Sequence, residues 1–113
     1  MSERPVAEPF REVTRLEALR EGAFEARIRE GWYQGRGAFG GLIVALIVRA
    51  LEALVGDDGR PLRTLTCHFC APAVAGALRI EVEVARSSSS VTHLSARVTQ
   101  AGGVVAIATA TRA

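Results

Sequence analysis

The stretch AFGGLIVALIVRAL, residues 38–51, decides the fold of this chain. After the glycine pair it continues as an apolar run, so it predicts one long helix over residues 40–55. The run GDDG at residues 56–59 ends this helix, because glycine suits the left-handed position that follows a helix. A helix that is apolar on every side must be enclosed by other elements, so we expect the rest of the chain to wrap around it.

The two glycines at the start of the helix, Gly40 and Gly41, allow two interpretations that are compatible. In the first, their backbone N–H groups bind a carbonyl oxygen or a phosphate, since the N-terminus of a helix favours negative charge. In the second, the absence of side chains only permits a close crossing of the helix and a strand. The sequence does not decide between them.

Strand-like segments surround the predicted helix, two before it and four after it. In the segment 23–30 the side chains of Phe24, Ala26 and Ile28 share one face and charged side chains share the other, the period of a strand with one wet side. One apolar helix among antiparallel strands must lie on their apolar face, with the sheet curling around it. The expected strands cover residues 14–19, 23–30, 62–70, 77–86, 91–100 and 104–111.

Composition limits the class of protein. A chain of 113 residues with 49% apolar residues is one domain with a real core, and a net charge of +2 does not indicate nucleic-acid binding. The charged first residues contain no apolar signal region. Arg49 and Glu52 interrupt the apolar helix, which is too short to span a bilayer. We therefore expect a cytoplasmic protein.

The order of these elements resembles that of the acyl-CoA thioesterase II-like family of double-hotdog proteins, in particular its N-terminal hotdog domain. The segments that carry the resemblance are AFGGLIVALIVRAL, LTCHFCAP, VEVARSSSSVTHLSARVTQAGG and VVAIATAT. It implies an α+β hotdog fold, a curved antiparallel sheet wrapped around one long central helix. Residues 13–113 would form a single hotdog domain after a flexible leader, residues 1–12.

The resemblance also implies a function, the hydrolysis or binding of acyl-CoA thioesters at an interface between two hotdog units. The expected partners are an acyl-CoA or related thioester and further copies of the chain, in a homodimer or higher homo-oligomer, with no nucleic acid and no membrane. In the family the catalytic Asp, Gln and Ser/Thr belong to the second hotdog, and here the N-terminal half of the helix has no carboxylate. The alternative is therefore a non-catalytic hotdog half that binds acyl ligands or serves as a structural and dimerisation module.

Thioester hydrolysis needs a base and donors aimed at the carbonyl oxygen. The candidate catalytic residues are His68, because histidine can act as a general base, and Gln100, a polar residue at the end of an apolar face. The alternatives are a hydrogen-bonded structural histidine and a glutamine that pins the following turn. Gly40 and Gly41 are the candidate thioester-binding backbone.

Four more residues are candidates for substrate binding: Trp32, Phe39, Arg86 and Ser90. Trp32 either lines an acyl channel or covers the core. Arg86 beside the serine run suits the phosphates of CoA, although a plain polar turn explains that run equally well.

We expect no cofactor and no metal. Cys67 and Cys70 form a C-x-x-C, but residues three apart on a strand face opposite sides of the sheet. Zinc would need ligands beyond His68 and His93, so the cysteines are interpreted as structural.

Overall fold

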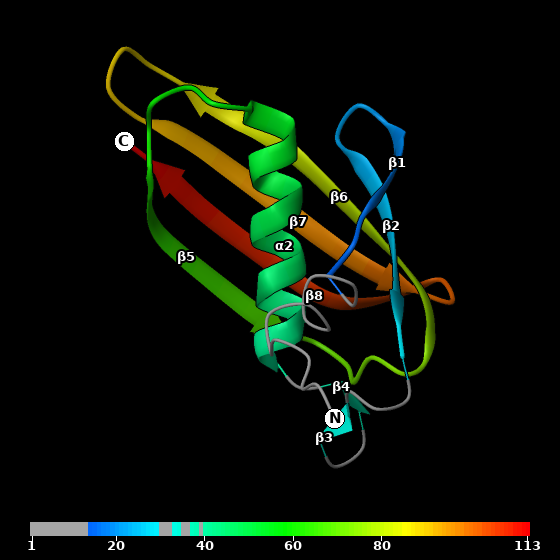
Figure 1. The fold of residues 1–113 in the computed structure, drawn as a ribbon. Helices are drawn as coiled ribbons and strands as arrows, with labels where there is room; N and C mark the ends of the chain where they lie inside the picture. The colour runs from blue at the N-terminus through cyan, green and yellow to red at the C-terminus, as the bar shows by residue number, and fades with distance from the viewer. Residues whose placement is uncertain (1–13, 30–32, 35–36, 39) are drawn as a thin grey trace, which may run out of the picture.

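The computed structural model describes residues 14–29, 33–34, 37–38 and 40–113. Figure 1 shows one helix lying across a sheet of long strands. The elements in chain order are β1 (Glu17–Arg20), β2 (Ala23–Ile28), β3 (Tyr33–Gln34), β4 (Gly37–Ala38), α2 (Gly40–Val55), β5 (Leu62–Phe69), β6 (Gly76–Ser87), β7 (Thr92–Gln100) and β8 (Gly103–Arg112).

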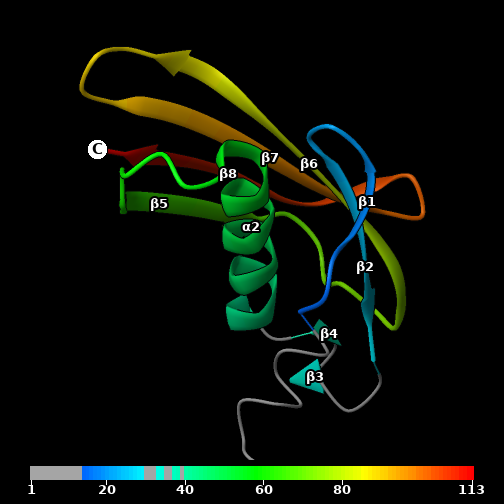
Figure 2. The same cartoon turned by 45° about the horizontal axis from the view of Figure 1, so that its top comes forward.

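Six of the strands form one antiparallel sheet in the order β1-β2-β6-β7-β8-β5, and β3 pairs with β4 separately. The sheet curves, and α2 lies on its concave side (Figure 2). This is the predicted α+β arrangement of a curved antiparallel sheet around one long helix. The two ends of the sheet order are β1 and β5.

The core lies between α2 and the concave face of the sheet. The side chains of Phe24, Ala26 and Ile28 are buried there, so the predicted apolar face of β2 is confirmed. The helix contributes six buried residues, Leu42, Ile43, Leu46, Ile47, Ala50 and Leu51. The other strands contribute alternate residues, among them Leu78, Ile80, Leu94, Ala96, Val98, Ala106, Ala108 and Ala110.

The helix is covered on one side rather than enclosed all round, which corrects the expectation from its composition. Val44, Ala45 and Val48 are only partly buried, and Arg49 is exposed. The reason is that the sheet is open. Its concave face covers one side of α2 and leaves the opposite side of the helix without a strand against it in the described part of the chain. The apolar residues on that side therefore lack full cover within the described part of the chain.

The predicted boundaries agree closely with the structure. The helix has the predicted bounds, and each strand after it differs from its predicted bounds by at most one residue at either end. The first strand begins at Glu17 rather than at residue 14, and Thr14, which is fully buried, lies in a turn before it. The predicted loop before the helix contains the short pair β3 and β4, and the predicted leader lies outside the described residues. No helix in the described residues is long and apolar enough to cross a membrane.

Candidate functional site

An open pocket of about 420 Å³ lies at the N-terminal end of α2. It is bounded by the first turn of the helix, the end of β5 and the segment that follows β5. Its described lining consists of Gly40, Ile43, Phe69, Cys70, Ala71, Pro72, Ala73 and Val105. None of these side chains is an acid, a base or an amide. The pocket therefore suits an apolar group that ends beside the helix N-terminus.

Gly40 and Gly41 differ in their surroundings. A Cβ on Gly40 would lie 3.0 Å from Cζ of Phe69, whose half-exposed ring covers that position. The close-crossing interpretation thus holds for Gly40, whereas Gly41 is exposed. Both residues belong to the first helical turn, whose N–H groups have no acceptor within the helix. That turn contains no acidic residue, so nothing on it opposes an incoming carbonyl oxygen.

The wall of the pocket opposite the helix is the segment 70–75, which the end of the β7–β8 hairpin holds in place. The carbonyl oxygen of Val105 accepts hydrogen bonds from the backbone N–H groups of Cys70 and Ala71, at 2.7 and 3.2 Å. Gln100 holds the other end of the segment. Its Oε1 accepts from the N–H of Val74 at 2.9 Å, and its Nε2 donates to the carbonyl oxygens of Val74 and Ala77 at 2.8 and 3.3 Å.

Gln100 thus acts on a different segment from the one expected. The sequence placed it against the turn that follows it, but its amide binds the connection between β5 and β6. The pairing of β7 with β6, in which Thr99 lies opposite Arg79, brings Gln100 next to the start of β6 and to this connection.

His68 lies on the opposite face of the sheet from the pocket. In β5 the side chains of Leu65 and Cys67 pack on the core and Phe69 packs on Gly40, so His68 points to the convex face with Thr66. The structure does not bring His68 to the helix N-terminus. Phe69 occupies that place instead, in phase with Leu65 and Cys67 on the core side of β5.

Arg86 and Ser90 lie at the other end of the molecule, in the β6–β7 hairpin next to the C-terminal end of α2 (Figure 1). A helix of 16 residues is about 24 Å long. These two residues therefore do not share one site with Gly40 within a single chain. Trp32 and Phe39 lie outside the described residues.

Arg60 joins the loop after the helix to that hairpin. Its guanidinium donates to the carbonyl oxygens of Ser88 and Ser89 at 3.0 and 2.8 Å and to Oγ1 of Thr92 at 2.9 Å. The hydroxyl of Ser88 closes the turn on Val91. Of the two interpretations of the serine run, the polar turn is the one that these contacts support.

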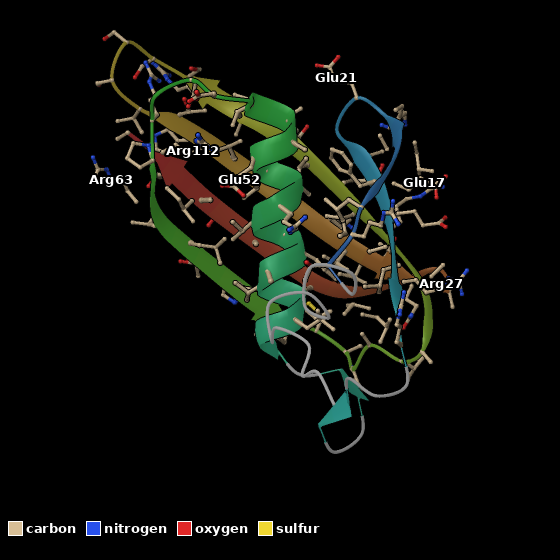
Figure 3. The ribbon with its side chains drawn as sticks, viewed as in Figure 1. Glu17, Glu21, Arg27, Glu52, Arg63 and Arg112 are labelled. Atoms are coloured by element: carbon tan, nitrogen blue, oxygen red, sulfur yellow. The ribbon has the colours of Figure 1, made fainter. Side chains whose placement is uncertain are left out.

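Arg112 makes a second tie at this end of the molecule. Arg112, labelled in Figure 3, has a buried guanidinium that pairs with Oδ1 of Asp58 at 2.9 Å. The hydrogen bond from the backbone N–H of Arg60 is the main cause that lowers the pKa of the Asp58 carboxyl below 3.8. Burial opposes this shift, and the hydrogen bond and charge of Arg112 add smaller lowering effects. These contacts give this end a structural role.

Both cysteines are free, and their environments differ. Burial, with a smaller contribution from Cys70, raises the pKa of the Cys67 thiol above 9.0. Cys70 is exposed and lines the pocket. Among the described residues no group of three or more His, Cys, Asp or Glu side chains is placed to hold a metal ion.

Comparison with known proteins identifies similar chains. The family model of the acyl-CoA thioesterase N-terminal domain matches residues 28–113. A conserved hotdog protein from Alicyclobacillus acidocaldarius is 31% identical, with a TM-score of 0.84 over 95% of this chain and 40% of its own. A protein from Thermobifida fusca, assigned provisionally as a thioesterase II, is 23% identical, with a TM-score of 0.84 over 92% of this chain and 38% of its own.

A third solved structure, a protein from Bacillus halodurans with CoA, is 19% identical, with a TM-score of 0.77 over 88% of this chain and 70% of its own. A comparison with the curated proteins found no match. The chain spans about 40% of the length of the first two structures. These similarities confirm the predicted hotdog fold.

Proposed function

The chain belongs to the acyl-CoA thioesterase N-terminal domain family, and from this premise we propose that it binds an acyl-CoA thioester for hydrolysis. The acyl group would enter the pocket at the N-terminal end of α2, between two hotdog units. The observation that carries the proposal is the pocket that ends on the first helical turn, whose described lining residues carry no charge. A fatty acyl chain needs an apolar wall, and its carbonyl oxygen needs N–H donors. The solved relative from Bacillus halodurans, which contains CoA, supports this ligand class.

In the reaction, water attacks the carbonyl carbon, the C–S bond breaks, and CoA leaves as a thiol. Negative charge develops on the carbonyl oxygen in the transition state. The N–H groups of Gly40 and Gly41 would stabilise it, an effect worth roughly 3 kcal/mol for one well-placed donor. The described residues that line the pocket supply no base. We propose that a second hotdog unit supplies the base. Because His68 lies on the convex face, it would act as a base only in a site formed with such a unit.

The edge strand β5 is the proposed place for the second unit, in a homodimer or higher homo-oligomer. Its residues 64–69, TLTCHF, contain no acid, Lys, Arg or Pro, although such residues normally protect an open strand edge. The opposite edge, β1, has only four residues, two of them charged, and an irregular register with β2. The asymmetry favours pairing through β5, next to Phe69 and the pocket.

The remaining substrate contacts are proposals for the assembled protein. Arg86 and Ser90 would bind CoA phosphates only for a ligand held by a neighbouring unit, given their distance from Gly40. Trp32 and Phe39 precede the helix and would extend the acyl channel. We place the activity in the cytoplasm, where both free thiols would stay reduced.

The alternative function is a non-catalytic hotdog half, and the absence of a base among the described pocket residues favours it. A series of acyl-CoAs with increasing chain length separates the two. Release of free CoA with turnover supports the hydrolase. Saturable binding without release supports the non-catalytic half. A protein that shows no binding and no release of CoA would contradict both functions.

Cys70 offers a test of where the ligand binds, with Cys67 as an internal control. Cys70 lines the pocket and is exposed, whereas Cys67 is partly buried in the core. We expect iodoacetamide to label Cys70 first and octanoyl-CoA to slow that labelling. Peptide mass spectrometry reads both sites. Equal labelling of Cys70 with and without a bound acyl-CoA would place the ligand elsewhere.

A further inference from the structure

The segment 70–75, which walls the pocket, connects two strands that are not neighbours. β7 and β8 lie between β5 and β6 in the sheet, so this segment crosses the end of the β7–β8 hairpin. Figure 1 shows it running along that end of the sheet, below the N-terminal part of α2. It contains no helix or strand. Its position therefore depends on the contacts that it makes with the hairpin.

These contacts come from two residues of the hairpin, one for each end of the segment. The carbonyl oxygen of Val105 fixes the first two residues, as described above. Gln100 fixes the far end by binding both backbone groups of Val74, as a neighbouring strand would, and by a third bond to Ala77. Between them Ala73 is buried in the core, and Pro72 faces the pocket.

The hydrogen bonds of Gln100 use both of its N–H donors. A glutamine amide has two such donors, and here they go to the carbonyl oxygens of Val74 and Ala77. No donor is left to stabilise charge on a ligand. The side chain can affect a bound ligand only through the segment that it holds.

We propose that Gln100 is a positioning residue for the acyl pocket, which sets the place of the wall at Pro72 and Ala73 through its hydrogen bonds to Val74. The inference rests on the proposed function, since it assigns the wall to an acyl ligand. Without Gln100 the segment keeps its tie to Val105 but loses the tie at Val74. The wall then samples more positions, and an acyl chain has to order the wall when it binds, which weakens its binding.

The test compares Gln100→Met and Gln100→Glu with the unaltered protein and with Ser95→Ala. Methionine keeps the length of the side chain without its hydrogen bonds. Glutamate keeps the acceptor but sets a carboxylate against two carbonyl oxygens. Ser95 is the control, because its hydroxyl bonds to Glu83 on the other face of the same strand at 3.4 Å.

Two readouts are expected to change together in both Gln100 variants. Amide exchange at Val74 should accelerate about tenfold or more, which corresponds to the loss of one or two hydrogen bonds. The preference for octanoyl-CoA over CoA, measured as a ratio of dissociation constants, should fall about tenfold, with CoA binding itself unchanged. Ser95→Ala should change neither.

Three results would overturn parts of this inference, and they can be told apart. Unchanged exchange at Val74 would show that Gln100 does not hold the segment in solution. Faster exchange with an unchanged octanoyl preference would leave Gln100 with a purely structural role. If the unaltered protein shows no octanoyl preference, the proposed function and the ligand part of the inference fail together, while the exchange rates still decide the role of Gln100 in the wall.

Discussion

The ring of Phe69 occupies the space that a side chain at Gly40 would need. The contact joins the end of the edge strand β5 to the first turn of α2, and the ring remains 54% exposed. A large aromatic side chain left half-exposed beside a pocket is a natural contact for an apolar ligand or a second unit. This pair connects the fold, the pocket and the proposed dimer edge.

Replacement of Gly40 by alanine should have opposite effects with and without Phe69. In the natural sequence the new Cβ lies 3.0 Å from Cζ of Phe69, so the ring must move, and we expect a loss of less than about 1 kcal/mol in unfolding free energy. In a Phe69→Ala background the contact is gone, and the better helix propensity of alanine should stabilise by about 0.5 kcal/mol. Urea unfolding of the four proteins measures both values. The same sign in both backgrounds would mean that the ring does not pack on Gly40.

Gly22 and Gly59 form a matched pair for a second prediction. Both have left-handed backbones, with φ of 76° and 73°, but only at Gly22 would a Cβ meet a backbone atom, the carbonyl oxygen of Val82 at 2.7 Å. At Gly59 nothing lies within 4 Å. Gly59→Ala should cost about 1 kcal/mol from its backbone conformation alone.

Gly22→Ala should cost roughly 1–3 kcal/mol more than Gly59→Ala, since the carbonyl of Val82 is fixed in the sheet. The backbone N–H of Val82 also donates to the carbonyl oxygen of Gly22 at 2.8 Å, so the strand cannot shift away freely. Thermal unfolding of the two variants gives the difference. Equal losses would contradict the close approach of Gly22 to the carbonyl oxygen of Val82.

Asp58 should make the stability of the protein depend on pH in the acid range. Its folded-state pKa is lowered below 3.8, so its contribution is present above that pH and is lost as the pH falls through the lower folded-state value. Asp58→Asn should be less stable at neutral pH and should lose less stability on acidification. Asp57→Asn, at the neighbouring exposed carboxylate, is the control. The measurement is the denaturant midpoint of each protein from neutral pH to below 3.8. If the midpoints of both variants change with pH as those of the unaltered protein do, Asp58 does not have this role.

The proposed dimer edge predicts a mutation that separates the subunits. Thr66 on β5 and Thr109 on β8 lie opposite each other on the same exposed face, but only Thr66 belongs to the edge strand. Thr66→Glu should place like charges near the paired edges and convert the dimer to a monomer. Thr109→Glu should leave it intact. Sedimentation at several concentrations decides, and a natural protein that is monomeric at all of them would contradict pairing through β5.

The sequence predicted the helix and the sheet because their signals are local. The bounds of α2 follow from a glycine pair and the stop at residues 56–59. The faces of β2, β6 and β7 follow from the alternation of apolar residues with polar or charged ones. Strand β5 lacks that contrast: Thr66, Cys67 and His68 differ little in polarity, so its core face could not be read. The choice between His68 and Phe69 for the pocket depended on that face.

The candidate site was only partly predictable, because strand order brings its parts together. The position of Gly40 at the helix N-terminus was predictable as a local feature, and its role in thioester binding stays a prediction. The contact of Gln100 with Val74 depends on the register of β7 with β6 and on the path of the chain between β5 and β6. In the same way, the positions of Arg86 and Ser90 far from Gly40 follow from which end of the sheet their hairpin occupies.

The central claim is that the acyl group of an acyl-CoA thioester binds at the N-terminal end of α2. A crystal structure with a ketone analogue of octanoyl-CoA, which keeps the carbonyl but cannot be hydrolysed, tests it most directly. The account predicts the carbonyl oxygen within hydrogen-bond distance of the N–H groups of Gly40 and Gly41, with the acyl chain against Phe69 and Pro72. An analogue bound elsewhere, with the pocket between α2 and residues 70–75 unchanged and free of ligand, would contradict it.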